Sequence, residues 1–213
     1  MIPFREMKII DIHTHILPEV PGTALVCIGC GPLPVGHGHL FSAGLHPWDV
    51  TGDDDESFRS LEKLLASPQV LAVGECGFDT LRGPAPELQE KAFLRQFELS
   101  ETHSKPMILH VVRYFDRIIR LKNSLKPSQK WLIHGFRGGP EQARQLIGCG
   151  FFLASGCTAR EETLKAFPQE SLLAETDGKC DIRTVIGRIA GFRELDYLRT
   201  EKLIESNISD FFA

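Results

Sequence analysis

The sequence has no long hydrophobic run, little net charge and no leader-like start, and each shortage excludes a class of protein. None of its apolar stretches approaches the ~18 residues of a membrane span. The opening MIPFREMKII holds too short an apolar run for a secretory signal. A formal charge of −4 gives no global footprint for a nucleic-acid partner, although a local basic patch is compatible with it. We therefore expect a cytoplasmic protein that does not contact membranes.

The sequence also lacks the features of a disulfide-rich or repeat protein. Six cysteines in 213 residues, without a secretory signal, are typical of buried reduced thiols rather than of a disulfide framework. Cys27 and Cys30 have the spacing of a redox or zinc motif, but residues three apart on a strand point to opposite faces. No internal repeat or linker divides the chain, and its 42% hydrophobic content is enough for one core. We predict a single domain over residues 1–213 and leave the oligomeric state open.

Short runs rich in Val, Ile, Leu and Phe recur along the chain, as buried parallel strands do. Many of them end in Gly, Pro or a polar residue. The eight predicted strands are Lys8–His13, Ala24–Cys30, Phe41–His46, Val70–Glu75, Met107–Val112, Lys130–Phe136, Phe151–Ser155 and Leu172–Asp177.

Helical patterns alternate with the later strands. The predicted helices are Asp55–Ala66, Glu87–His103, Arg113–Leu125, Pro140–Ile147, Arg160–Phe167, Arg183–Ala190 and Glu194–Phe211. Eight parallel strands with intervening helices favour an α/β fold of the (β/α)8 TIM-barrel class. The first two connections are too short or too rich in Pro and Gly for a crossover helix. We therefore expect a distorted barrel that lacks one or two outer helices in its N-terminal third.

Histidines and acids stand at the ends of the predicted strands. His13 and His15 lie two apart on a strand, so both imidazoles project from one face and can reach one cation. Glu75, His110, His134 and Asp177 each end a separate apolar run. The carboxyl ends of parallel barrel strands meet at one mouth, where catalytic groups lie in such folds. The sequence thus predicts a metal site built from these six residues, although each residue alone is typical of a structural polar group.

Six segments, in this order, resemble the TatD family of metal-dependent hydrolases. They are Asp11–His15, Gly44–Pro47, Gly74–Asp79, Ile108–His110, Ile133–Phe136 and Glu175–Asp177. The resemblance covers nearly the whole chain and implies hydrolysis of phosphodiester bonds, typically in DNA. The chain departs from the family after Asp177, where Gly178-Lys179-Cys180 replaces a small residue, a proline and an aromatic. It is also shorter than the family's usual members in its first two connections.

The resemblance also implies a cofactor of two divalent ions. His13, His15, Glu75 and Asp177 would hold one ion, while Glu75, His110 and His134 would hold the second, with Glu75 between them. Histidines suit zinc, and carboxylates also admit magnesium or manganese. Two such ions can activate a water and stabilise the entering and leaving oxygens of a displacement. Asp177 and Glu75 are the predicted catalytic residues, with Asp177 orienting or deprotonating the water.

Four further residues are candidate substrate contacts. His46 and Asp79 match family positions near the pocket, while Arg113 and Arg137 each follow a predicted ligand by three residues and could clamp a phosphate. The alternative is a structural role for the first two and a solvated surface position for the arginines. Trp48, near a strand end, is best interpreted as rim packing, with stacking on a base as the alternative.

Three functions remain compatible with these residues. A phosphodiesterase or deoxyribonuclease acting on DNA or a small phosphodiester is the leading hypothesis. An amide, lactone or other ester hydrolase on the same scaffold is the alternative enzyme, since barrels host many chemistries. A metal-binding or scaffolding protein with little catalysis is the third. Substrate profiling distinguishes the two enzymes, whereas the complete ligand set argues for metal binding without establishing turnover.

Overall fold

The structure, a computed structural model, describes residues 8–36 and 38–213. Most of the opening segment MIPFREMKII therefore lies outside the described residues. The chain forms two compact units, of which one comprises the described residues up to Val26 together with Ile133–Ala213, and the other comprises Cys27–Leu132. No described helix is long and apolar enough to cross a membrane. The single domain over residues 1–213 and the cytoplasmic location stay predictions.

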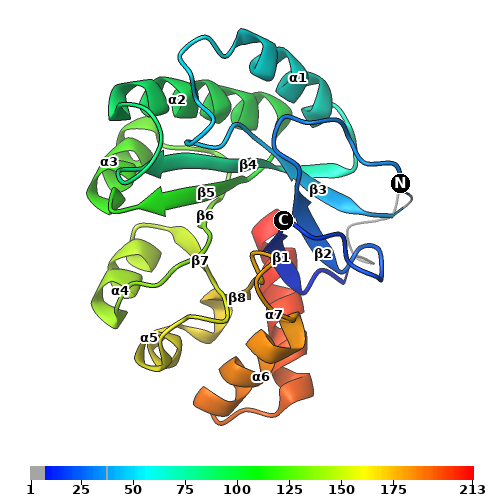
Figure 1. The fold of residues 1–213 in the computed structure, drawn as a ribbon. Coiled ribbons are helices and arrows are strands. Elements are labelled where there is room, and N and C mark those ends of the chain that lie inside the picture. Colours follow the sequence, from blue (N-terminus) through cyan, green and yellow to red (C-terminus); the bar gives the residue numbers. More distant parts are fainter. Residues whose placement is uncertain (1–7, 37) are drawn as a thin grey trace. The chain divides into compact units, whose positions relative to one another are not determined.

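Eight strands form at the eight predicted places (Figure 1). They are β1 (Asp11–Thr14), β2 (Ala24–Cys27), β3 (Leu40–Ala43), β4 (Val70–Asp79), β5 (Met107–Val112), β6 (Trp131–Ile133), β7 (Phe151–Ser155) and β8 (Leu172–Ala174). Most strand residues are buried, which explains why they read as continuous apolar runs.

The strands are hydrogen-bonded neighbours in chain order. The Cys27–Leu132 unit holds β3, β4 and β5, and the other unit holds β7, β8 and β1, while β2 and β6 each contain a boundary between the units. The strand pairs β1–β2, β3–β4, β4–β5 and β7–β8 are parallel. β8 leads directly back to β1, because the Asp177 N–H donates to the His13 carbonyl at 3.0 Å. This strand order confirms the predicted (β/α)8 class.

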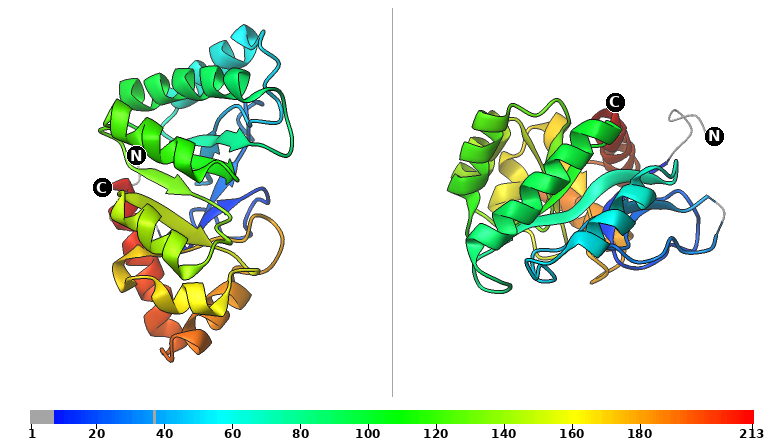
Figure 2. Two further views of the ribbon diagram at one scale, coloured as in Figure 1. Left: turned by 90° about the vertical axis from the view of Figure 1, so that its left-hand side faces the viewer. Right: turned by 90° about the horizontal axis from the view of Figure 1, so that it is seen from above.

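Helices follow the later strands, as predicted. They are α1 (Asp55–Leu65), α2 (Pro86–His103), α3 (Phe115–Leu125), α4 (Pro140–Gly148), α5 (Glu161–Ala166), the 3-10 turn η2 (Gln169–Ser171), α6 (Ile182–Phe192) and α7 (Tyr197–Phe212). Within the described parts of 15–23 and 28–39 there is no helix, so the two connections before β3 lack outer helices, as predicted for one or two helices of the N-terminal third. Helix α2 packs against β4, and α7 packs against β8 (Figure 2).

Several predicted boundaries were wrong: β1, β2, β3 and β6 are shorter than predicted, and β4, β8 and α7 differ for clear local reasons. β4 continues past Glu75 to Asp79, because Gly77 has a φ of 137° and lets the strand stay paired with β5 beside the His110 carbonyl. β8 ends at Ala174, and the chain turns at Asp177 with a φ of 52°. Helix α7 starts at Tyr197 rather than at Glu194, because the Asp196 carboxylate caps it by accepting from the Arg199 N–H at 3.0 Å.

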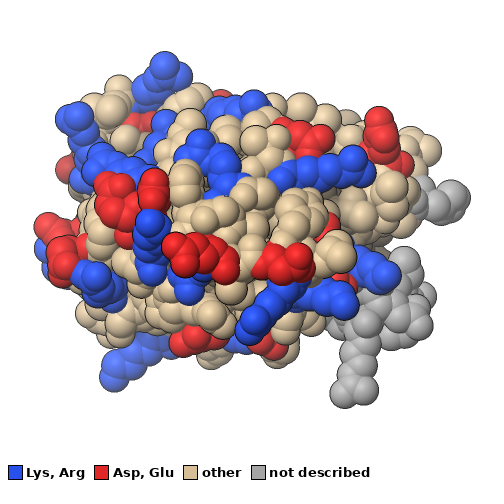
Figure 3. Space-filling model, turned by 90° about the horizontal axis from the view of Figure 1, so that it is seen from below, with Lys and Arg blue, Asp and Glu red and all other residues tan. Residues whose placement is uncertain are grey.

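The face drawn in Figure 3 carries charges of both signs. On this face, Lys and Arg side chains are interspersed with Asp and Glu side chains. Mixed charge of this kind agrees with the small formal charge of −4. Any nucleic-acid contact of this face must therefore depend on particular side chains rather than on a broad basic field.

Candidate metal centre

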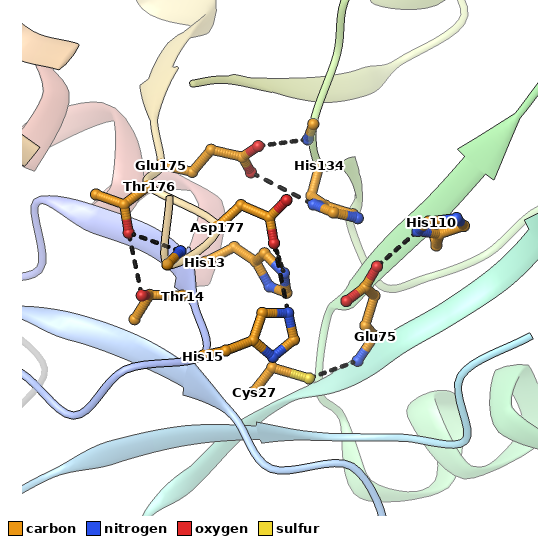
Figure 4. Close-up of polar contacts among 12 residues, drawn as sticks. His13, Thr14, His15, Cys27, Glu75, His110, His134, Glu175, Thr176 and Asp177 are labelled. Carbon is orange, nitrogen blue, oxygen red and sulfur yellow. Dashed lines mark hydrogen bonds and ion pairs between the residues drawn. The ribbon is translucent and has the colours of Figure 1, made fainter. Parts of the chain in front are cut away.

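Each unit carries one compact cluster of ligand-type side chains. In the unit that contains β1 and β8, the ligand atoms of His13, His15 and Asp177 all lie within 4.8 Å of one another (Figure 4). Asp177 Oδ1 lies 3.4 Å from His15 Nε2 and 3.7 Å from His13 Nε2. His13 is fully buried, whereas the His15 side chain is 47% exposed. Two imidazoles and a carboxylate thus converge on one point that solvent can reach.

Contacts between β1 and the segment after β8 hold this cluster in place. The buried Asp11 carboxylate accepts from the Thr176 N–H at 3.0 Å and from the Thr176 hydroxyl at 2.7 Å. The same hydroxyl lies 3.0 Å from Thr14 Oγ1. Burial raises the pKa of Asp11 to about 6, partly offset by the hydrogen bonds from Thr176. Asp11 lies two residues before His13, and Thr176 directly precedes Asp177. The network therefore fixes the backbone that carries these two candidate ligands.

Asp177 is electrostatically prepared to stay ionised. Burial alone would raise its pKa, but hydrogen bonds from His15 and Lys179, together with the electrostatic effect of His134 and His13, outweigh burial and lower the pKa. The Lys179 ammonium pairs with Asp177 Oδ2. An ionised carboxylate is the form that binds a cation or accepts a proton.

His134 and Glu175 extend the same cluster. The His134 ring lies 4.3 Å from the His13 ring, and His134 Nδ1 lies 3.8 Å from Glu175 Oε2. Glu175 is 1% exposed, and burial raises its pKa to about 8, although the nearby His13 lowers it. Its Oε1 accepts from the Gly135 N–H at 2.5 Å. Glu175 was not among the predicted ligands, although it lies two residues before Asp177 in the same predicted strand.

The Cys27–Leu132 unit carries the second cluster. The ligand atoms of His46, Glu75 and His110 all lie within 4.8 Å of one another. Glu75 Oε1 lies 2.7 Å from His110 Nδ1 and 3.3 Å from His46 Nε2. Burial would lower the pKa of His110, but the hydrogen bonds and charges of Glu75 and Asp79 together outweigh burial and raise it. The buried Glu75 is the centre of this cluster, between two imidazoles.

Asp79 supports the second cluster from the end of β4. Its Oδ2 lies 3.2 Å from His110 Nε2 and accepts from Trp48 Nε1 at 2.7 Å. Its Oδ1 accepts from the N–H groups of Leu81 and Arg82 at 2.7 and 3.1 Å. Burial alone would raise the pKa of Asp79, but these hydrogen bonds lower it. Both carboxylate oxygens are therefore engaged by protein groups, which gives Asp79 a positioning role.

Buried side chains hold the backbone around the second cluster. The Glu75 N–H donates to Cys27 Sγ at 3.4 Å. Burial raises the pKa of the Cys27 thiol. All six cysteines are free, but only Cys76 is fully buried and the other five are half-buried, so the prediction of buried thiols was wrong for those five. The buried Gln96 of α2 binds both backbone groups of Leu45, accepting from its N–H at 2.8 Å and donating to its carbonyl at 3.0 Å. Leu45 directly precedes His46, so Gln96 fixes the backbone position from which the His46 side chain reaches the cluster.

Gln96→Ala is expected to lower the free energy of unfolding by about 1–3 kcal/mol, because both backbone groups of buried Leu45 lose their partner. Urea denaturation measures the change. Glu98→Ala, an exposed position on the same helix, is the control and should change stability by less than about 0.5 kcal/mol. Equal stability of the two variants would show that Gln96 does not hold Leu45 in solution.

The predicted site residues divide between the two units. His13, His15, His134 and Asp177 lie in one unit, while His46, Glu75, Asp79 and His110 lie in the other. The exposed Arg137 lines a small pocket with Asp177 and Lys179. Arg113 follows β5 with an exposed side chain and a φ of 57°. The placement of Glu75 on both ions and the substrate contacts of the two arginines stay predictions.

The donor sets suit a divalent cation. Neutral imidazole with carboxylate is the ligand combination that zinc, manganese and related ions accept in hydrolases. Each cluster offers two histidines and one acid within the span of a single coordination sphere. Each cluster therefore has the donor set that is typical of metal-dependent hydrolases.

Comparisons with known proteins agree with this class. Residues 36–213 match the TatD related DNase family. The chain belongs to this family.

Curated relatives carry the name 3'-5' ssDNA/RNA exonuclease TatD. The chain is 33% identical over 146 residues to the protein of Cronobacter turicensis, 34% over 152 residues to that of Klebsiella pneumoniae, and 32% over 152 residues to that of Escherichia coli K12. Each match covers 64% of this chain and 56% of the relative. The chain thus matches little more than half the length of these relatives.

Solved structures show the same fold. The TatD homologue YjjV of Escherichia coli K12 superposes with a TM-score of 0.81 at 20% identity, covering 96% of this chain and 98% of the other. A TatD family hydrolase of Entamoeba histolytica gives a TM-score of 0.74 at 18% identity, over 89% of this chain and 85% of the other. Both likenesses support the (β/α)8 class predicted from the strand and helix pattern.

Proposed function

We propose that this chain is a divalent-metal-dependent phosphodiesterase that cleaves DNA or a smaller phosphodiester. The observation that carries the proposal is that a chain of a DNase family forms, in each unit, a cluster of two imidazoles and one carboxylate. The names of the curated relatives, which specify single-stranded DNA and RNA, favour a single-stranded substrate.

Two divalent cations, magnesium, manganese or zinc, are the proposed cofactor. His13, His15 and Asp177 are the proposed ligands in one unit, while Glu75 and His110, joined by His46, are those in the other. The family resemblance adds His134 and makes Glu75 a ligand of both ions. When bound, such ions supply Lewis-acid chemistry that activates water and neutralises the charge of a phosphoryl group.

The side chains then have distinct proposed roles. Asp177, ionised and partly exposed, orients the attacking water and accepts its proton. Arg137 beside Asp177 and Lys179 binds a phosphate oxygen, and Arg113 is a second candidate for that contact. Asp79 orients His110 through the 3.2 Å contact with its Nε2. In this scheme the protein contributes ligand geometry and proton acceptance, and the fixed histidines and acids require little rearrangement.

The test is cleavage of end-labelled single-stranded DNA and RNA by chelator-stripped protein to which magnesium, manganese or zinc is restored. We expect cleavage only with a restored metal, and labels at either end of the strand reveal its direction. A circular single strand separates internal cleavage from cleavage at an end. If measured metal binding is accompanied by hydrolysis of amides, lactones or other esters but not of phosphodiesters, the alternative hydrolase replaces the proposal. Metal binding without any hydrolysis would favour the non-catalytic protein.

A further inference from the structure

Two loops beside the second cluster carry an exposed aromatic ring together with a cation. The loop after β3 contains Trp48, which is 44% exposed. The loop after β4 contains Leu81, which is 61% exposed, and Arg82, which is also exposed. The Arg82 guanidinium lies over the Trp48 ring at 4.7 Å from its centroid. The two loops thus present an aromatic ring, an apolar side chain and a cation side by side at the surface.

The ring is held rigidly although it is exposed. Trp48 Nε1 donates to Asp79 Oδ2 at 2.7 Å, and the Trp48 N–H donates to His46 Nδ1 at 3.2 Å. The Trp48 ring also contacts the His46 ring edgewise at 4.7 Å and the His110 ring at 5.7 Å between centroids. The position of the indole is therefore fixed relative to two of the proposed metal ligands.

The second loop is equally fixed. The buried Gln89 donates through Nε2 to the carbonyls of Asp79 and Pro84 at 3.0 and 2.8 Å. A Cβ at Gly83 would lie only 2.6 Å from the Pro47 carbonyl, so the two loops pack directly together. Asp79 binds the N–H groups of Leu81 and Arg82 from one side and the indole from the other. The ring and the guanidinium thus form a preorganised pair.

We propose that Trp48 and Arg82 form a stacking platform that binds a nucleobase of the single-stranded substrate next to the His46–Glu75–His110 cluster. The inference rests on the proposed nuclease function and specifies how that site binds single-stranded nucleic acid. An indole offers a flat apolar face to any base, and an arginine over it adds a cation for the neighbouring phosphate. Such stacking tolerates any sequence, because every base has a π face.

The first test measures binding without turnover, in chelator, through tryptophan fluorescence. The chain has two tryptophans, and Trp131 is fully buried, so a Trp131→Phe background reports Trp48 alone. We expect an oligodeoxyadenylate to quench this signal to saturation, whereas an abasic strand with the same phosphates does not quench it. Equal quenching by both strands, or by neither, would overturn the stacking platform.

The second test separates stacking from support of the cluster. Trp48→Ala should raise KM for a single-stranded oligonucleotide by about 5- to 100-fold, Trp48→Phe should raise it less, and kcat should change little. Both variants also lose the indole hydrogen bond to Asp79, so the change in kcat/KM on a small phosphodiester without a base measures that shared effect, and the loss on the oligonucleotide should exceed it. Leu198→Ala, which removes another exposed apolar side chain, is the control and should match the wild type on both substrates. An unchanged oligonucleotide KM, or equal losses of kcat/KM on the two substrates, would overturn the inference. Failure of the wild type to cleave any phosphodiester would instead reject the proposed function, while the quenching test still decides on base binding.

Discussion

Glu75→Gln is expected to lower kcat/KM for metal-dependent phosphodiester cleavage by at least about 100-fold. Replacing a residue that only supports a metal ligand already lowers metal affinity or activity by about 10- to 100-fold, and loss of a ligand should cost more. Glu75 lies between His46 and His110 at 3.3 and 2.7 Å and is the acid of their cluster. The amide keeps the shape of the side chain but removes its negative charge. Metal affinity, measured by calorimetric titration of chelator-stripped protein, should fall together with activity.

Glu87→Gln is the matched control for this experiment. Glu87 lies in the first turn of α2 with an exposed side chain, so the same chemical change there should leave metal affinity and cleavage unchanged. A folded Glu75→Gln protein that cleaves at the wild-type rate would show that Glu75 is not part of the catalytic site. Loss of cleavage with unchanged metal affinity would assign Glu75 a role on the substrate instead.

Gly77→Ala is expected to lower the free energy of unfolding by about 2–4 kcal/mol, since backbone strain and overpacking each cost about 1–3 kcal/mol. Gly77 has a φ of 137°, and a Cβ there would lie 2.2 Å from the His110 carbonyl oxygen. That oxygen belongs to the backbone of β5, which pairs with β4 at this point, so it cannot move aside without disturbing the sheet. Urea denaturation followed by circular dichroism measures the loss.

Gly187→Ala is expected to raise the free energy of unfolding, in contrast to the same substitution at Gly77. Gly187 lies within α6, and a Cβ there meets nothing within 4 Å. Alanine should therefore stabilise the helix by about 0.5–1 kcal/mol, because it loses less conformational freedom on folding than glycine does. If both variants had the stability of the wild type, the close approach of β4 and β5 at Gly77 would not exist in solution. A lower metal affinity of Gly77→Ala in a calorimetric titration would show that His110 is displaced together with β5.

The candidate ligands could be predicted because their positions depend on local pattern. A histidine or acid at the end of an apolar run lies at the carboxyl end of a strand, and these ends are where sites form in parallel α/β folds. His13 and His15 share one face because strand side chains alternate. The structure accordingly brings Asp177 within 3.4 Å of His15 and Glu75 within 2.7 Å of His110.

The supporting contacts could not be predicted from the same pattern. The partnership of Asp11 with Thr176 joins residues 165 positions apart, and that of Gln96 with Leu45 joins residues 51 apart. Trp48, interpreted as rim packing, is 44% exposed and hydrogen-bonded to Asp79. Such pairs depend on which strand ends and helix faces pack together, and periodicity within one segment does not specify this.

Sequence alone determined the class of this protein: eight apolar strand runs, helices between the later ones, and ligand-type residues where those runs end. These features follow from side-chain alternation and helical periodicity, which act within a few residues. Tertiary structure decided how far each strand extends, since Gly77 keeps β4 paired beside His110. It also decided that His46 joins Glu75 and His110, and that Asp79 binds Trp48. Those outcomes arise from close packing and hydrogen bonding between distant segments, whose free energies exist only once the chain has folded.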